Sequence, residues 1–291
     1  MNLAVQTFAG CCAELYELPI VEYLLGHSFH PGGAALTRRL ASAALVSPGS
    51  RVLDVACGNG NSARRLAADF GADVTGCDYS ARNIAFATAA AGQDGNQTRT
   101  QFVRCDAEHL PFAAASFDVV LCECSLCLFD NLDAALDQMR RVLKPSGRIG
   151  ISDFYLEAPV PVSLDNLLGQ VLCVASAPSK GTYHDALLRS GFEFVRIRNV
   201  NWTLTDMIER VRHRLHRLAT VPEMADARLP ADWSDPAPVL AELETFIASG
   251  GAGYLMATAS RISPNMAYKS TDDGSGSFEP TPKLCNSRPF S

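Results

Sequence analysis

Short apolar segments alternate with helix-like segments between residues 51 and 154, and this alternation constrains the fold more than any other feature. The first apolar segment, RVLDVAC at 51–57, leads into the turn CGNGNS and then into the helix-like SARRLAADF. Such alternation is typical of parallel βαβ units, and the nearly continuous apolar character indicates strands covered on both faces. We therefore predict a doubly wound α/β fold. The other strand-like segments are 73–78, 100–107, 116–124 and 148–154.

The alternation weakens after residue 155, where the predicted elements are less regular. Residues 205–220 form a basic amphipathic pattern, which we interpret as a solvated helix face, with an anionic binding surface as the alternative. Residues 263–291 are rich in Ser, Gly, Pro and Asp and are expected to be a disordered tail. The remaining predictions are a buried helix at 164–176, a helix at 182–192, and strands at 193–202 and 251–261.

Charge and composition argue against several classes of protein. The 291 residues carry a formal net charge of −6 with a pI near 5.5, which disfavours a nucleic-acid partner. No apolar run reaches the length of about 18 residues that a transmembrane helix needs. The segment MNLAVQTFAGCC lacks basic residues ahead of its apolar stretch, so it is a poor signal peptide. We expect a cytoplasmic protein without a membrane partner, whose thiols stay reduced.

Acidic residues close three of the strand-like segments, and glycines follow the first of them. Gly58 and Gly60 lie where glycine lets the backbone approach a ligand, and the following helix offers free N–H groups. Asp78 is placed to accept the two hydroxyls of a ribose, and Asp106 to accept the amino group of an adenine. Asp54, directly before the turn, suits an ammonium group better than a pyrophosphate. A nucleoside that carries an amino acid, S-adenosylmethionine (SAM), fits this pattern better than a dinucleotide.

Over residues 50–155 the chain resembles the class I SAM-dependent methyltransferases, although Ala56 stands where their DxGxG turn has its first glycine. The segments that carry the resemblance are RVLDVACGNGNSARRLA, VTGCDYS, FVRCDAEHLPFAAASFDVVLC and LDAALDQMRRVLKPSGRIGISDF. The resemblance implies a seven-stranded, mostly parallel, Rossmann-like sheet, whose one antiparallel strand the segment at 251–261 would supply. It divides the chain into an N-terminal helical lid at 1–47, a methyltransferase domain at 48–262 and the tail at 263–291.

The resemblance also implies a set of SAM-binding residues. They are Asp54, Ala56, Gly58 and Gly60 at the methionine half, Asp78 at the ribose, Tyr79, Asp106 and Ala107 at the adenine, and Cys122 near the methionine moiety. Members of the family often close a tyrosine-bearing N-terminal segment over SAM. Tyr16 therefore is either part of such a lid or a packed core aromatic.

The chain has ten cysteines, and three of them lie in CECSLC at 122–127, directly after a predicted strand. Each cysteine taken alone is interpretable as a small buried hydrophobe. The segments that hold Cys11, Cys12 and Cys173 are expected to fold over the acceptor site, which would gather their thiols near Cys124. Several thiolates would select a soft acceptor, and trivalent arsenic is the leading hypothesis.

Local resemblance to arsenite methyltransferases supports this hypothesis, because those enzymes carry cysteines where Cys124 and Cys173 stand. The resemblance assigns Cys11, Cys12 and Cys173 as ligands of the arsenic substrate and requires no resident metal. The chain departs from that family at His27, which replaces a cysteine, and it has no counterpart of a C-terminal binding cysteine.

Two alternatives to the soft acceptor stay open. An ordinary oxygen, nitrogen or carbon acceptor on a small molecule would leave the cysteines structural and would need a base. The second alternative is a module that binds SAM or a metalloid without catalysis. A macromolecular substrate is disfavoured, because the chain has neither an NPPY-like motif nor a basic groove. Candidate bases are His27, His30, Glu123 and His184.

Overall fold

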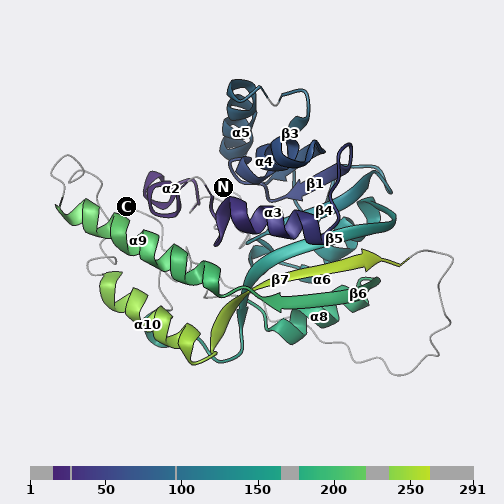
Figure 1. Ribbon diagram of the computed structural model, residues 1–291. Helices are drawn as coiled ribbons and strands as arrows, with labels where there is room; N and C mark the ends of the chain where they lie inside the picture. The colour runs from purple at the N-terminus through teal and green to yellow at the C-terminus, as the bar shows by residue number, and fades with distance from the viewer. Residues whose placement is uncertain (1–15, 27, 96, 165–176, 221–235, 263–291) are drawn as a thin grey trace, which may run out of the picture.

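A seven-stranded sheet forms the centre of the computed structural model, which describes residues 16–26, 28–95, 97–164, 177–220 and 236–262. The strand order is β3-β2-β1-β4-β5-β7-β6 (Figure 1). Neighbouring strands from β3 to β5 pair in parallel, whereas β7 runs antiparallel to both β5 and β6. The strands are β1 (Arg51–Val55), β2 (Asp73–Asp78), β3 (Thr100–Arg104), β4 (Phe117–Glu123), β5 (Leu143–Leu156), β6 (Phe192–Asn199) and β7 (Ala252–Arg261).

Helices cover both faces of this sheet, and alternate residues of the central strands point into two separate cores. Val52 and Val119 belong to the core shared with α3 and α4, while Leu53 and Val120 belong to the core shared with α6 and α8. Helices α2, α9 and α10 extend the first core at one end of the molecule (Figure 1). The helices are α2 (Pro19–Leu25), α3 (Gly33–Ala43), α4 (Asn61–Phe70), α5 (Ala81–Gln93), α6 (Leu132–Val142), α8 (Lys180–Arg189), α9 (Trp202–Thr220) and α10 (Pro236–Ala248).

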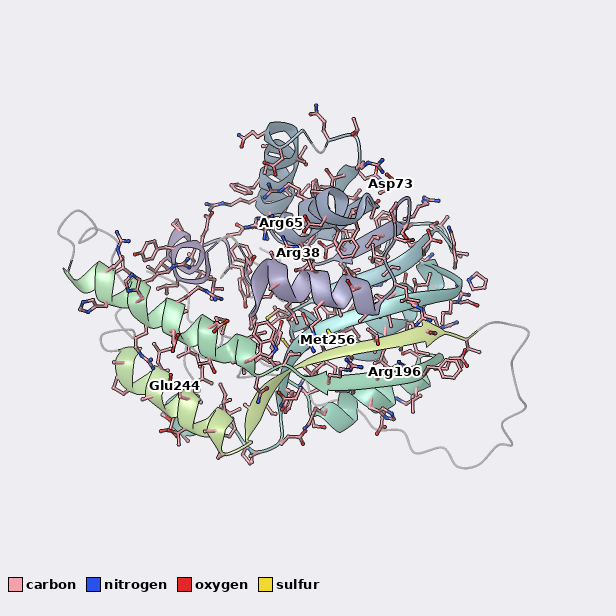
Figure 2. The ribbon with its side chains drawn as sticks, in the orientation of Figure 1. Arg38, Arg65, Asp73, Arg196, Glu244 and Met256 are labelled. Atoms are coloured by element: carbon pink, nitrogen blue, oxygen red, sulfur yellow. The ribbon has the colours of Figure 1, made fainter. Side chains whose placement is uncertain are left out.

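Charged side chains lie on the outside of these layers. Arg38, Asp73 and Arg196 are exposed, whereas Met256 of β7 is buried between the sheet and its helices (Figure 2). Arg38 pairs with Asp69 at 2.7 Å, but exposed pairs of this kind contribute only about 0–1 kcal/mol. The two apolar cores therefore supply most of the stability.

The predicted α/β fold with a mostly parallel, seven-stranded sheet is confirmed. Several boundaries differ by a few residues, and β5 differs most: the predicted strand starts at 148, but β5 already begins at Leu143. The pairing with β4 steps from Phe117↔Leu143 to Val119↔Arg148, so the turn-like residues form an irregularity inside the strand.

Several predicted segments lie outside the described residues, among them most of the helix at 164–176 and the tail at 263–291. Within the ranges that are described, no helix combines the length and the apolar character needed to cross a membrane.

Candidate functional site

A pocket that is open to solvent lies at the carboxyl ends of β1, β2 and β4. This is the edge of a parallel sheet at which open α/β folds bind their ligands. The wall is formed by Tyr16, Ser28, Phe29, His30, Asp54, Ala56, Cys57, Gly58, Asn59, Asn61, Ser62, Asp78, Tyr79, Asn83, Glu123, Cys124, Ser125, Leu128 and Phe129.

The turn after β1 forms the floor of the pocket and runs through left-handed backbone conformations. Gly58 and Gly60 have φ angles of 53° and 73°, which glycine adopts without strain. The N–H of Gly58 donates to Oδ2 of Asp78 at 2.8 Å, so β2 holds the turn in place. Ala56 has a φ of 56° in the same turn, although it carries a Cβ atom. The turn is thus held in shape even where its residue is not glycine.

We expect Ala56→Gly to stabilise the protein by about 0.5–1 kcal/mol. A left-handed conformation costs a non-glycine residue roughly 1–2 kcal/mol, and the greater chain entropy of glycine offsets part of the gain. Urea unfolding measures the difference. Ala115, an exposed residue outside the pocket with a φ of 54°, offers the matched control Ala115→Gly. A loss of stability at position 56 together with a gain at 115 would contradict the strain argument.

Three carboxyl groups, those of Asp54, Asp78 and Glu123, face the pocket. Asp54 is 2% exposed, and its Oδ2 has no hydrogen-bond partner in the described part of the chain. Burial, and then the charges of Glu123 and Asp78, raise the pKa of Asp54 well above its ordinary value. Because no lysine or arginine occurs among the described residues of the wall, a cationic ligand would relieve this repulsion.

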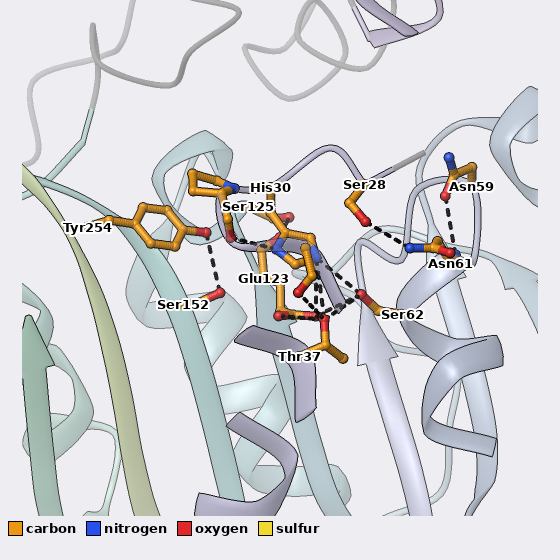
Figure 3. Close-up of polar contacts among 12 residues, drawn as sticks. Ser28, His30, Thr37, Asn59, Asn61, Ser62, Glu123, Ser125, Ser152 and Tyr254 are labelled. Atoms are coloured by element: carbon orange, nitrogen blue, oxygen red, sulfur yellow. Dashed lines mark hydrogen bonds and ion pairs between the residues drawn. The ribbon is translucent and has the colours of Figure 1, made fainter. Parts of the chain in front are cut away.

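A buried polar cluster, which includes Glu123, joins α3, α4, β4 and the loop before α3 (Figure 3). His30 precedes α3, Thr37 lies in α3, Ser62 in the first turn of α4, and Glu123 at the end of β4. Ser62 donates to Oε2 of Glu123 at 2.8 Å, and Nε2 of His30 lies 3.3 Å from Oγ of Ser62. The sequence identified His30 and Glu123 as candidates, but it gave no signal for Thr37 and Ser62, whose roles depend on tertiary contacts.

The other two candidate bases are not part of this cluster. His184 is near Asp185 on the surface of α8, with Nδ1 and Oδ1 3.1 Å apart, and it does not line the pocket. His27 lies outside the described residues.

The predicted SAM-binding residues divide into two groups. Asp54, Ala56, Gly58, Asp78, Tyr79 and Tyr16 line the pocket. Gly60, Asp106, Ala107 and Cys122 do not. Gly60 is the N-cap of α4, Asp106 pairs with His109 at 3.1 Å beyond β3, and Ala107 and Cys122 are packed in the core. The assignment of both groups to SAM stays a prediction.

The cysteines of CECSLC point in different directions. Cys122 and Cys127 are fully buried, each in a different core, and only Cys124 reaches the pocket. Burial and the charge of Asp153 raise the pKa of Cys122 well above its ordinary value, so this side chain stays a thiol. Within the described ranges, no three His, Cys, Asp or Glu residues are arranged to hold a metal ion. The other proposed arsenic ligands, Cys11, Cys12 and Cys173, lie outside the described residues.

Comparison with known proteins places this architecture in a family. Residues 53–151 match the family model described as "Methyltransferase domain". The O-methyltransferase rstn1 of Aspergillus nomiae is 31% identical over 170 residues, which cover 58% of this chain and 75% of that protein. The chain belongs to the class I SAM-dependent methyltransferases. Members of this family transfer a methyl group from SAM, the cofactor that the acidic strand ends and the glycine turn of the sequence predicted.

A further relative is similar in sequence, and a solved structure is similar in fold. The 27-O-demethylrifamycin SV methyltransferase of Amycolatopsis mediterranei is 38% identical over 130 residues, which cover 45% of this chain and 47% of that enzyme. Phosphoethanolamine N-methyltransferase 2 of Haemonchus contortus, solved with SAM, superposes with a TM-score of 0.70 at 20% identity. That superposition covers 88% of this chain and 57% of the Haemonchus chain. The matched region spans about half the length of several curated relatives.

Proposed function

We propose that this methyltransferase methylates a hydroxyl oxygen of a small, largely apolar molecule. The observation that carries the proposal is the buried imidazole of His30 in the wall of the pocket, because an oxygen acceptor must give up a proton. The aromatic and aliphatic side chains of Tyr16, Phe29, Leu128 and Phe129 line the same pocket and suit an apolar acceptor. The O-methyltransferase rstn1 and the 27-O-demethylrifamycin SV methyltransferase, two relatives of this chain, support the choice of oxygen.

The acidic wall supports a specific placement of SAM, which supplies a methyl group on a positively charged sulfur. Oδ2 of Asp54 has no hydrogen-bond partner among the described residues and is available to an ammonium group. The nearby carboxyl groups of Glu123 and Asp78 add negative charge that favours a cation. Asp78, beside the exposed ring of Tyr79, is placed to accept the ribose hydroxyls. Tyr16, whose ring lies 5.9 Å from that of Phe29, would cover SAM from the N-terminal side.

A series of naphthalene probes with different acceptor atoms tests the proposal. Purified protein is incubated with radiolabelled SAM and, separately, with 1-naphthol, 1-naphthylamine, 1-naphthalenethiol or sodium arsenite, and the products are identified by mass spectrometry. The ring is the same in three probes, so the acceptor atom decides the result. We expect methylated naphthol as the main product. Methylation of the amine or the thiol in preference to the naphthol would overturn the assignment to oxygen.

Cys124 favours a second candidate, methylation of a soft acceptor such as trivalent arsenic. Its thiol lies in the wall of the pocket, and its φ of 56° holds the residue in a conformation that is unfavourable without a compensating role. The arsenite arm of the same series separates the two functions. Methylated arsenic that disappears in Cys124→Ser and in Cys173→Ser would favour the soft acceptor. Naphthol methylation that both variants retain would favour oxygen, and SAM binding without any turnover would favour a binding module.

A further inference from the structure

The hydrogen-bond partners of the His30 ring are matched to its protonated form. The ring is 7% exposed, and Nδ1 lies 3.1 Å from the carbonyl oxygen of Pro31. A carbonyl oxygen only accepts, so Nδ1 must carry a hydrogen. Nε2 faces Oγ of Ser62 at 3.3 Å and Oγ1 of Thr37 at 3.5 Å.

The hydrogen of Ser62 points to Glu123, and that of Thr37 has Glu123 and the carbonyl oxygen of Gly33 as its acceptors. Ser62 donates to Oε2 at 2.8 Å, and Thr37 lies 3.1 Å from Oε2 and 3.2 Å from Oε1. Each hydroxyl then has lone pairs that face Nε2 of His30, and Nε2 donates a hydrogen to them once the ring is protonated. Oε2 of Glu123 is itself 3.7 Å from Nε2. Acceptor atoms thus lie near both ring nitrogens, and one carboxylate is close to Nε2.

We propose that His30 is the general base of the methyl transfer and that Glu123 is the positioning residue that stabilises its protonated ring. The inference rests on the proposed O-methyl transfer. In the neutral ring, the bond from Nδ1 to Pro31 leaves the lone pair on Nε2, and this is the atom that takes the proton. The surroundings match the charge that develops during reaction, which is the condition for lowering a barrier.

The reaction balances without another reagent. The acceptor oxygen forms a bond to the methyl carbon as the carbon–sulfur bond breaks, and the electron pair of that bond stays on sulfur. The hydroxyl proton moves to Nε2 of His30. The ring becomes an imidazolium next to the carboxylate of Glu123, and it later returns the proton to solvent through the open pocket.

The charged groups that line the pocket together with His30 are acidic. Glu123 approaches from β4, and Asp54 at the end of β1 lines the same pocket, as does Asp78 at the end of β2. Helices α3 and α4 contribute only the uncharged hydroxyls of Thr37 and Ser62.

The test compares wild type with His30→Gln, Glu123→Gln and the surface control His184→Gln. The rate of 1-naphthol methylation is measured from pH 5 to 9 at saturating SAM. We expect His30→Gln to lower kcat at least about 100-fold, the lower end of the usual contribution of a general base, with the KM for SAM little changed. Glu123→Gln should lower kcat less and move the acidic limb of the profile to lower pH, because the carboxylate no longer stabilises the proton on the ring. His184→Gln should match wild type.

A second readout does not require turnover. Nitrogen NMR of histidine-labelled protein with bound S-adenosylhomocysteine reports which ring nitrogens carry hydrogens, and His30→Gln assigns the signal. At one pH, the ring of His30 should be less protonated in Glu123→Gln than in wild type. An unchanged ring signal in Glu123→Gln would overturn the role of Glu123 in stabilising the protonated ring. An unchanged kcat in His30→Gln would overturn the role of His30 as the general base. If wild type leaves 1-naphthol unmethylated while the ring responds to Glu123, the proposed function fails for this acceptor and the acid–base pair stands.

Discussion

Asp54→Asn is expected to lose at least about 100-fold in affinity for SAM, which is roughly 2.7 kcal/mol, while the ligand-free protein becomes more stable. The carboxylate of Asp54 is buried with an unpartnered oxygen beside two other acids, so it destabilises the ligand-free protein and attracts a cation. Isothermal titration calorimetry with SAM and thermal unfolding without ligand measure the two effects on one sample.

The pH dependence follows from the direction of the shift. The pKa of Asp54 is raised in the folded protein, so the folded state binds this proton more tightly than the unfolded state. The contribution of Asp54 to stability is therefore present below the ordinary pKa of a free aspartate and is lost as the pH rises toward the raised value. Asp54→Asn should remove this loss of stability at higher pH. It should also remove the increase in SAM affinity with rising pH, which proton release from Asp54 causes.

Asp73→Asn serves as the control, because Asp73 is an exposed acid at the start of β2 that pairs with Arg99. It should leave the affinity for SAM unchanged. If Asp54→Asn binds SAM as tightly as wild type, the buried carboxylate does not hold a cationic group of SAM, and the placement proposed above is wrong.

Gly60→Ala is expected to destabilise the protein by about 2–5 kcal/mol. A Cβ atom at this position would lie 2.7 Å from Cβ of Ala87 and 2.8 Å from the ring of Phe102, in a residue with a φ of 73°. The left-handed backbone accounts for about 1–2 kcal/mol of this loss and the overpacking for a further 1–3 kcal/mol. Urea unfolding of the variant gives the total.

Gly95 separates the two contributions, because it has the same φ of 73° and a Cβ atom added there would meet no other atom within 4 Å. Gly95→Ala should therefore lose only the conformational part. Equal losses at the two positions would contradict the close packing of α4 against α5 and β3 beneath the pocket.

The sequence predicted the strand–turn–helix units because each is encoded locally, by an apolar run, a glycine turn and an amphipathic helix. The sequence could not predict which cysteine side chains lie in the same core. Cys122 and Cys124 are two residues apart, a spacing that normally puts both side chains on one face of a strand. Cys124 follows the end of β4 with a left-handed φ, which breaks the alternation of the strand, and the two side chains lie in different cores.

The polar cluster escaped prediction for a related reason. Thr37 and Ser62 are ordinary helical residues in the sequence, and only the packing of α3 against α4 brings them to Glu123. The start of β5 at Leu143 was missed because its irregular residues resemble a turn, and the pairing with β4 is not visible in the local pattern.

The strand order has a consequence for how such an enzyme diversifies. Strands β1 and β4 are neighbours, yet the helices that follow them, α4 and α6, belong to the cores on opposite faces of the sheet. The two connections therefore diverge and leave a crevice at the point where the winding direction switches. The crevice is a product of topology and would persist if its lining residues were exchanged. Acceptor choice can thus change through the loops at its rim while the sheet stays as it is.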